Sequence, residues 1–197
     1  MARIETARLH DLPGAYRVCL LTGDAGRDAS ARYRDLDLLG HLYVGPYLVA
    51  GTGTQLVVVD AGGVSGYLVS ADDTLAFETW AEAAWWPALR ARHPLLADGS
   101  PDADLVARIH APERTPVAIA RVFPAHAHVD LLERVRGLGL GRALMDRLAA
   151  DLRARSVAGV HLGVDPSNTD AVAFYAHLGY RELQVTTDTI WMGLRLA

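Results

Sequence analysis

Lysine is absent from the 197-residue chain, so all 19 of its basic residues are arginines. Without lysine the chain has no P-loop, because the Gly-Lys-Ser/Thr motif needs that side chain to reach the phosphates. Cysteine is nearly absent as well: with Cys19 alone, no disulfide can form within the chain, which fits a reducing compartment. Cys19 lies in an apolar run, so we expect a small core residue there and not a nucleophile.

A strong charge of either sign and long apolar runs are also lacking. The net charge of −4 argues against an extended nucleic-acid-binding face. No apolar run approaches the roughly 20 residues of a membrane span, and the first residues, MARIETARLHD, lack the apolar block of a signal peptide. No spacing of potential ligands indicates a metal site. We therefore expect a cytoplasmic enzyme or binding protein with no metal and no nucleic-acid or membrane partner.

The first 124 residues predict a series of strands and helices. The expected elements are a strand over 3–9, a helix over 11–21, a second helix over 29–39, a hairpin of strands 55–60 and 64–70, a helical stretch over 72–92 that Pro87 interrupts, a loop over 93–103 and a strand over 104–110. Residues 24–47 are mixed in periodicity, so we expect them to cover one face as a lid or substrate-side element.

From residue 125 on, the patterns are clearer. Strict alternation predicts a strand over 125–132, with His126, His128 and Asp130 on one face. The remaining elements are expected, in order, as a leucine-striped helix over 139–155, a strand over 159–165, a helix over 169–178 capped by Ser167 or Asn168, and closing strands over 180–186 and 189–196. Together these elements predict an α/β (α+β) chain around a mixed sheet.

The loop before the leucine-striped helix is rich in glycine. It reads RGLGLGRALM over residues 136–145, with Gly137, Gly139 and Gly141 at alternate positions. Glycine lets the backbone approach a ligand closely, and the N–H groups at the start of a helix bind phosphate or pyrophosphate. A Rossmann fingerprint would follow an early strand and have an acidic residue about 20 residues on. The loop therefore predicts either a phosphate-binding site that is neither a P-loop nor a Rossmann site, or a turn without a ligand.

Two motifs follow one another in this part of the chain. Residues 136–141 match Gln/Arg-x-x-Gly-x-Gly/Ala, and residues 168–180 match Asn-x-x-Ala-x-x-Phe-Tyr-x-x-x-Gly-Phe/Tyr. With both motifs in this order, the chain resembles the GNAT N-acetyltransferase superfamily, and the close match covers residues 125–183. More loosely, the chain is similar to bacterial acetyltransferases that resemble the C-terminal acetyltransferase-like domain of O-GlcNAc hydrolases.

The resemblance implies a single GNAT domain over 1–197, with acceptor-side elements in 1–124, an acyl-CoA-binding core in 125–183 and closing strands in 184–197. It implies a sheet of about six to seven strands, flanked by helices and splayed at the acyl-CoA site. The implied activity is acetyl transfer from acetyl-CoA to a primary amine by direct attack on the thioester. Protein lysines, amino-sugars, polyamines and antibiotic amines are all open as acceptors, and a homodimer is the default assembly.

The resemblance also implies site residues. In the family the glycine loop holds the CoA pyrophosphate, and the strand before it pairs with the pantetheine arm. The cofactor-binding residues carried over to this sequence are Val129, Leu131, Leu132, Arg136, Gly137, Leu138, Gly139, Leu140, Gly141, Arg142, Asn168 and Tyr175. Arg142 is equally a solvated surface arginine, and Asn168 equally a helix N-cap. The Tyr175 hydroxyl is implied as the acid that protonates the leaving thiolate, against the alternative of a core tyrosine.

The base that takes the proton from the amine is not given by the resemblance, because Ala125 stands near the position of the glutamate that many relatives use. Asp130 is the first candidate, since a charge in a central strand is costly unless it is paired or used. His126 and His128 are the alternatives. Without a base, the chain would be a catalytically silent module that binds acyl-CoA. The aromatic residues that could line an acceptor pocket, or pack in the ordinary way, are Tyr33, Tyr43, Tyr47, Trp85 and Trp86.

Overall fold

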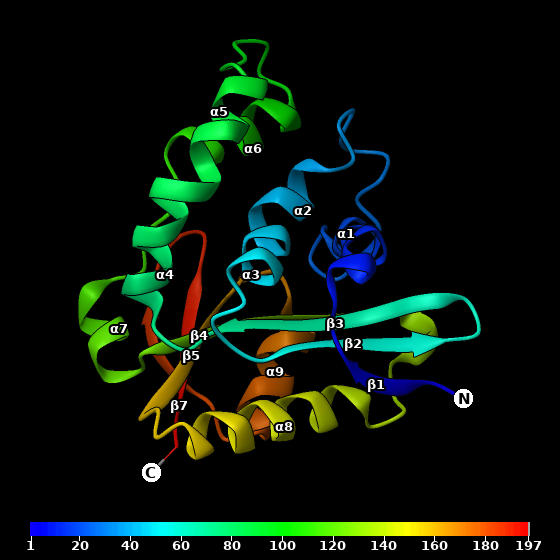
Figure 1. Cartoon of the computed structure of the whole chain (residues 1–197), viewed down its shortest axis with the longest axis vertical. Helices are drawn as coiled ribbons and strands as arrows, with labels where there is room; N and C mark the ends of the chain where they lie inside the picture. Colours follow the sequence, from blue (N-terminus) through cyan, green and yellow to red (C-terminus); the bar gives the residue numbers. More distant parts are fainter. Residues whose placement is uncertain (197) are drawn as a thin grey trace.

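A seven-stranded mixed sheet forms the centre of the computed structural model, which describes residues 1–196 (Figure 1). The strand order is β1–β2–β3–β4–β5–β7–β6. All neighbours are antiparallel except β4 and β5, which are parallel. The strands are β1 (Arg3–Thr6), β2 (Gln55–Asp60), β3 (Gly63–Ala71), β4 (Ala125–Leu131), β5 (Gly159–Val164), β6 (Arg181–Val185) and β7 (Ile190–Arg195). The predicted class, the mixed sheet and the approximate number of strands are confirmed.

Helices cover both faces of this sheet. They are α1 (Leu12–Thr22), α2 (Leu38–Tyr43), α3 (Gly45–Ala50), α4 (Thr74–Trp80), α5 (Trp86–Arg92), α6 (Pro101–His110), α7 (Val117–Val122), α8 (Leu140–Ala154) and α9 (Thr169–His177). Short 3-10 turns cover Leu9–Asp11 and Glu133–Val135, and a π-helical turn, Ala81–Trp85, joins α4 to α5. Within residues 1–196, no helix is both long enough and apolar enough to cross a membrane.

The sheet separates two apolar cores. On one face, α8 and α9 pack against buried strand residues such as Leu68 and Ala127. On the other face, α1 to α6 pack against residues such as Tyr67, and in Figure 1 α1, α2 and α3 lie on the opposite side of the strands from α8. The free Cys19 thiol lies in this second core, so the prediction of a core cysteine is confirmed. Both faces of the central strands are covered.

The ends of α8 and α9 follow from local sequence. In α8 the apolar stripe predicted from leucine spacing is confirmed, because Leu144, Leu148 and Leu152 are fully buried. Asn168 caps α9, its Oδ1 accepting a hydrogen bond from the Ala171 backbone N–H at 3.2 Å. Gly179 follows the helix with a φ of +91°, which glycine adopts without a steric penalty. These signals place both helices close to where the sequence predicts them.

One predicted element is wrong in type: residues 104–110 form part of helix α6 and not a strand. The helix begins at Pro101, and the Ser100 hydroxyl oxygen caps it by accepting a hydrogen bond from the Ala103 N–H. Its buried residues, Leu105, Val106 and Ile109, have helical spacing. The start signal lies inside the stretch that was expected to be a loop, which is why the pattern after it was misassigned.

The helix predicted over 29–39 is also wrong. Residues 29–37 form turns, and a helix begins only at Leu38. The buried Asp102 carboxylate accepts hydrogen bonds from the backbone N–H groups of Arg34 and Asp35, at 3.0 to 3.2 Å. A carboxylate that binds consecutive N–H groups competes with helix formation. This contact joins residues 67 and 68 positions apart, so no local pattern indicates it.

The sheet opens between its two parallel strands. The β4–β5 ladder has only two residue pairs, Ala125 with Val160 and His126 with His161. Beyond them β4 continues to Leu131 and pairs with β3 alone. The N–H and C=O groups on the other edge of β4 are therefore free of sheet partners from about residue 127 on. This is the splay that the resemblance implied.

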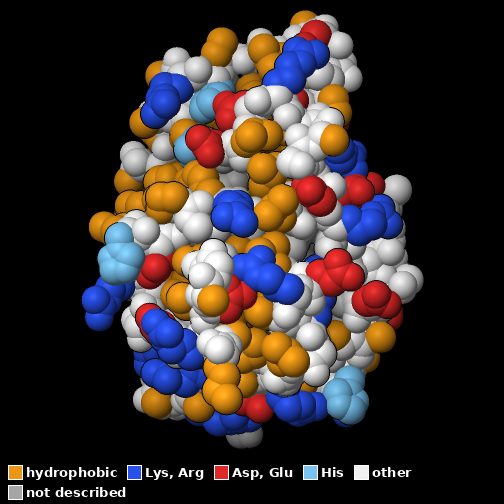
Figure 2. Space-filling model, turned by 90° about the vertical axis from the view of Figure 1, so that its right-hand side faces the viewer, with side chains coloured by type: hydrophobic (Ala, Val, Ile, Leu, Met, Phe, Trp, Pro, Cys, Tyr) orange, Lys and Arg blue, Asp and Glu red, His pale blue; other side chains and the backbone are white. Residues whose placement is uncertain are grey.

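Charged side chains of both signs are spread over the surface. On the face shown in Figure 2, arginine side chains alternate with acidic and apolar ones. Several arginines pair with carboxylates, for example Arg134 with Asp60 at 2.8 Å and Arg147 with Asp151 at 3.0 Å. Exposed pairs of this kind contribute little to stability, typically about 0–1 kcal/mol each. The free energy of folding therefore depends mainly on the two apolar cores.

The buried stripe of α8 gives a stability prediction. Leu148→Ala removes a side chain that is fully buried between α8 and the sheet, and we expect it to lower the free energy of unfolding by about 2–5 kcal/mol. Urea unfolding followed by circular dichroism measures the change. Val185→Ala, at a side chain that is 59% exposed, is the control and should change it by less than about 0.5 kcal/mol. Equal effects of the two variants would contradict this packing.

Candidate active site

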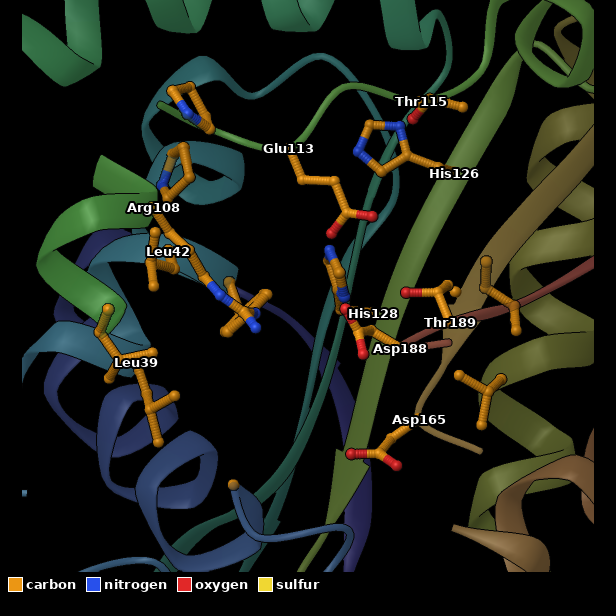
Figure 3. A pocket seen from close by; sticks show the side chains of 18 of the residues that line it. Leu39, Leu42, Arg108, Glu113, Thr115, His126, His128, Asp165, Asp188 and Thr189 are labelled. Carbon is orange, nitrogen blue, oxygen red and sulfur yellow. The ribbon is translucent and has the colours of Figure 1, made fainter. Parts of the chain in front are cut away.

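A cavity of about 660 Å³ lies where β4 and β5 separate. Its floor includes His126 and His128 from β4 and His161 from β5. Its walls come from residues far apart in the sequence, among them α2, α3, α4, α6 and the segments around residues 24, 113 and 188 (Figure 3). Pockets of this size and position, at a break in a sheet, are where small ligands bind in α/β proteins. The cavity is therefore the first candidate for an active site.

Two histidines on β4 belong to one chain of hydrogen bonds. The Thr74 hydroxyl donates to the Pro124 carbonyl at 2.7 Å and lies 2.8 Å from Nδ1 of His126. Nε2 of His126 lies 2.7 Å from the Tyr47 hydroxyl, which lies 2.9 Å from Nε2 of His128. The chain thus runs from a backbone carbonyl through four side chains to the cavity. Tyr47 is held in place by its ring, which stacks on Phe77 with centroids 4.4 Å apart.

Both imidazoles are kept neutral by their surroundings. Burial is the main cause that lowers the pKa of His128, to about 4, and the nearby His161 lowers it further. Burial also lowers the pKa of His126 well below its ordinary value, and His128 and His161 add to this effect. At neutral pH each ring therefore carries one proton and one free lone pair.

Asp130 lies on the same face of β4 as His126 and His128, but it does not line the cavity. The Tyr67 hydroxyl donates a hydrogen bond to its Oδ2 at 2.5 Å. Burial raises the pKa of Asp130 to about 6, although the hydrogen bond from Tyr67 acts in the opposite direction. A carboxyl group with this pKa is divided between its two protonation states just below neutral pH.

Tyr175 lies in the apolar core on the α9 side of the sheet. Its side chain is 8% exposed, and its ring lies 5.6 Å from that of Tyr180. Burial raises the pKa of its hydroxyl above the ordinary value, and the charge of Asp130 raises it further. The phenol is therefore protonated at any physiological pH. Like Asp130, Tyr175 lies outside the cavity lining.

The glycine loop has a backbone that only glycine adopts readily. Gly137 and Gly139 have φ angles of +72° and +76°, and a Cβ added to either would meet no atom within 4 Å. At Gly141 a Cβ would lie 3.2 Å from the ring of Phe174, so the third glycine allows close packing. Helix α8 starts after Gly139 without a side-chain cap, which leaves the N–H groups of its first turn available to an anion. The loop thus fits a pyrophosphate.

Arg136 connects the glycine loop to two other segments. Its Nε donates to the Leu131 carbonyl, and its Nη2 donates to the Gly26 carbonyl, each at 2.8 Å. Asp24 and Ala25, from the same turn as Gly26, line the cavity. The turn therefore joins the loop to the cavity, in line with the prediction that residues 24–47 cover one face. The Arg142 side chain is exposed, and the Asn168 side chain caps α9.

Three carboxylates project into the cavity. Figure 3 shows Glu113, Asp165 and Asp188 around the same space as His128, from three separate segments of the chain. The cavity also contains Arg108, which donates a hydrogen bond to the Tyr43 hydroxyl at 2.8 Å. The sequence offered no signal for Glu113 or Asp188, because each lies in a loop without periodicity.

The structure places four of the five predicted aromatic residues in the cavity lining: Tyr33, Tyr43, Tyr47 and Trp86. Trp85 does not line the cavity, and its indole N–H donates a hydrogen bond to the His41 carbonyl.

Comparison with known proteins agrees with this geometry. The sequence pattern of the acetyltransferase (GNAT) family matches residues 71–180, more than half of the chain. Among solved structures, the one described as the crystal structure of SsHAT is 34% identical, with a TM-score of 0.91 over 100% of this chain and 98% of that one. The structure of yncA from Salmonella typhimurium, with its cofactor acetyl-CoA, is 18% identical and has a TM-score of 0.56 over 100% of this chain and 94% of that one.

Curated relatives match over shorter or weaker stretches. Serotonin N-acetyltransferase 2, chloroplastic, from Oryza sativa subsp. japonica is 44% identical over 71 residues, which are 33% of this chain and 34% of that protein. Protein O-GlcNAcase from Rattus norvegicus is 22% identical over 178 residues, which are 88% of this chain and 19% of that protein. The chain spans about a third or less of the length of these relatives, and the looser resemblance to O-GlcNAc hydrolases is confirmed as weak homology. The chain belongs to the acetyltransferase (GNAT) family.

Proposed function

We propose that the protein transfers the acetyl group of acetyl-CoA to a primary amine. The observation that carries the proposal is the opening between β4 and β5 beside the cavity, together with the uncapped start of α8 and its glycine loop. When bound there, acetyl-CoA supplies an acetyl thioester. The family membership and the similar fold of a structure that holds acetyl-CoA support this choice of cofactor.

The free edge of β4 suits the pantetheine arm. Val129 and Leu131 have strand neighbours on the β3 side only, so on the other edge the backbone of Val129 and the N–H of Leu131 can bond the amides of the arm. The Leu131 carbonyl already accepts a hydrogen bond from Arg136, and the Leu132 N–H donates to the Ser65 carbonyl, so Leu132 would only adjoin the arm. The pyrophosphate would lie against the backbone of residues 137–142, with Leu138 and Leu140 flanking the glycines. Arg136 would add positive charge, and Asn168 would bond the arm while it caps α9. This direction points the thioester toward Tyr175 and the cavity.

The acceptor would enter through the cavity as a cationic amine. Glu113, Asp165 and Asp188 project into this space, and a carboxylate-lined cleft raises the local concentration of cations. Arg108 faces the same space but is held by Tyr43, which reduces the preference for anions. Protein lysines, polyamines, amino-sugars and antibiotic amines all carry the required charge. A cytoplasmic location stays a prediction from the single free cysteine.

The second candidate, a silent module that binds acyl-CoA, is less well supported. It was motivated by the missing family glutamate near Ala125. Neutral histidines in the cavity and a protonated Tyr175 supply groups that can move protons. We therefore propose a catalyst, with Tyr175 as the acid that gives its proton to the leaving sulfur.

Cofactor binding can be tested at the glycine loop. Gly139→Glu places a carboxylate where the pyrophosphate would lie, and we expect acetyl-CoA binding to be lost in isothermal titration calorimetry. Gly63→Glu is the matched control, because Gly63 also has a positive φ, +92°, and no atom within 4 Å of an added Cβ. It is the first residue of β3, next to the β2–β3 turn, and the variant should leave the affinity unchanged. Retained binding by the Gly139 variant would contradict the pyrophosphate assignment.

The role of Tyr175 gives a second prediction. Tyr175→Phe keeps the buried ring but removes the acid, so we expect kcat to fall by about 100-fold or more. The Kd for acetyl-CoA should change by less than about threefold, because the backbone groups that bind the cofactor are untouched. Thiol release measures kcat, and calorimetry on the same preparation measures Kd. An unchanged kcat would reject the acid role.

Asp130 gives a prediction of pH dependence. Its pKa in the folded protein, about 6, is above the ordinary value of 3.8, so the folded state loses stability relative to the unfolded chain as the pH rises from 4 through 6. Asp130→Asn removes this penalty. We expect the variant to be more stable than wild type by on the order of 2 kcal/mol at pH 8 and nearly equal to it at pH 4.

Urea unfolding at the two pH values measures this difference. Asp146→Asn, on an exposed part of α8, controls for the change in net charge. A variant that is less stable than wild type at pH 8 would show that the Asp130 charge is compensated in the folded state.

A further inference from the structure

We propose that Nδ1 of His128 is the base that takes the proton from the acceptor amine, and that Tyr47, His126 and Thr74 are positioning residues that hold His128 in the required tautomer. The proposal rests on the proposed function. It deepens that function, because the family glutamate has no counterpart in this sequence near Ala125. The chain of hydrogen bonds beneath the cavity connects these four side chains.

The direction of each hydrogen bond follows from one end of this chain. The Pro124 carbonyl can only accept, so the Thr74 hydroxyl donates its single proton to it. Thr74 must then accept from His126, which places the proton of His126 on Nδ1. Nε2 of His126 is left with a lone pair, and it accepts the proton of the Tyr47 hydroxyl.

The remaining bond fixes His128. The Tyr47 oxygen has donated its only proton to His126, so it accepts from Nε2–H of His128. A neutral imidazole with its proton on Nε2 has an unprotonated Nδ1. His128 lines the cavity, so this lone pair is available to a molecule bound there. The two histidines, two residues apart on one strand, are thus assigned opposite tautomers.

The surroundings of His128 keep its ring neutral until it takes the proton of the acceptor amine. Its aromatic and imidazole neighbours are His126 on the same strand, Tyr43 from α2, Tyr47 from α3 and His161 from β5. The charged groups that share its space are Asp165 after β5, Glu113 and Asp188, with Arg108 beyond Tyr43. Burial and His161 hold its pKa down, so the base is unprotonated at pH 7. The carboxylates of Glu113, Asp165 and Asp188 share the cavity and would stabilise the imidazolium once it forms.

The transfer balances with these groups. The bound ammonium first loses one proton to solvent, which gives the neutral amine. The amine nitrogen then bonds to the acetyl carbon, and its second proton to be lost passes to Nδ1 of His128. The carbon–sulfur bond breaks, and the sulfur takes the proton of the Tyr175 hydroxyl. The products are an amide and a free thiol. His128 then returns its proton to solvent through the cavity and Tyr175 regains one, so neither residue is changed after a turnover.

The tautomers can be measured without any substrate. In 15N-labelled protein at pH 7, long-range 1H–15N correlations distinguish a ring protonated on Nδ1 from one protonated on Nε2. We expect His126 to be protonated on Nδ1 and His128 on Nε2. Tyr47→Phe should leave His126 in place but convert His128 to a mixture of both tautomers. Finding both rings protonated on Nε2 in the wild type would overturn the assignment.

A matched control exists elsewhere in the chain. The Tyr16 hydroxyl lies 3.0 Å from Nδ1 of His41, in a tyrosine–histidine pair outside the cavity lining. Tyr16→Phe removes a hydrogen bond of the same kind and should leave both β4 histidines and kcat unchanged. If Tyr16→Phe and Tyr47→Phe alter the β4 histidines equally, the effect is a general one of folding and the positioning role is overturned.

Kinetics test the base itself. With a lysine peptide, glucosamine, spermidine and kanamycin as acceptors, thiol release identifies an acceptor for the wild type. We expect His128→Gln to lower kcat by about 100-fold or more, with an unchanged Kd for acetyl-CoA by calorimetry. Tyr47→Phe should lower kcat by about 10-fold without raising the KM for acetyl-CoA, since it disturbs only the tautomer of the base.

The outcomes separate the two proposals. Acetyl transfer that survives His128→Gln but is lost in Asp130→Asn would overturn the role of His128 and leave the proposed function standing. Binding of acetyl-CoA by the wild type with no transfer to any of the four acceptors would instead favour the silent module and overturn both. Loss of transfer in His128→Gln, together with opposite tautomers in the wild type, supports the assignment.

Discussion

The short ladder between β4 and β5 is the constraint on which the site depends. Parallel strands normally pair along their length, but here only Ala125 and His126 have partners on β5. The rest of β4 keeps a free edge, the cavity lies beside it, and α8 begins beyond its end. The shape of a binding cleft at a break in a sheet comes from the strand geometry and not from one particular side chain. The apolar cores on the two faces, formed by α8 on one and by α1 to α6 on the other, pack against the strands and keep them separated.

The second half of the chain could be predicted well because its signals are local. Strict alternation marks β4, leucines four apart mark α8, and the positive φ angles of Gly137 and Gly139 explain why glycine occupies these positions. The first half was harder because its conformation depends on distant contacts. The Asp102 carboxylate binds the backbone near Arg34, which replaces the helix expected there with turns. The Ser100 cap turns an expected strand into α6.

The same distinction holds for the site. The resemblance pointed to the glycine loop and to Tyr175 because their motifs are contiguous in sequence. The hydrogen-bonded chain of Thr74, His126, Tyr47 and His128 joins three separate segments, and no spacing indicates it. Alternation did place His126 and His128 on one face, so the strand supplied two members of the chain. The partners that decide which nitrogen carries the proton come from the fold alone.

The central claim is that the opening between β4 and β5 and the start of α8 together form the cofactor site. Amide hydrogen exchange with and without acetyl-CoA tests this claim most directly. The account predicts slower exchange at residues 129–132 and 137–142 when acetyl-CoA is present, with β1 and β2 unchanged. Protection confined to other segments, or no protection at saturating acetyl-CoA, would contradict it.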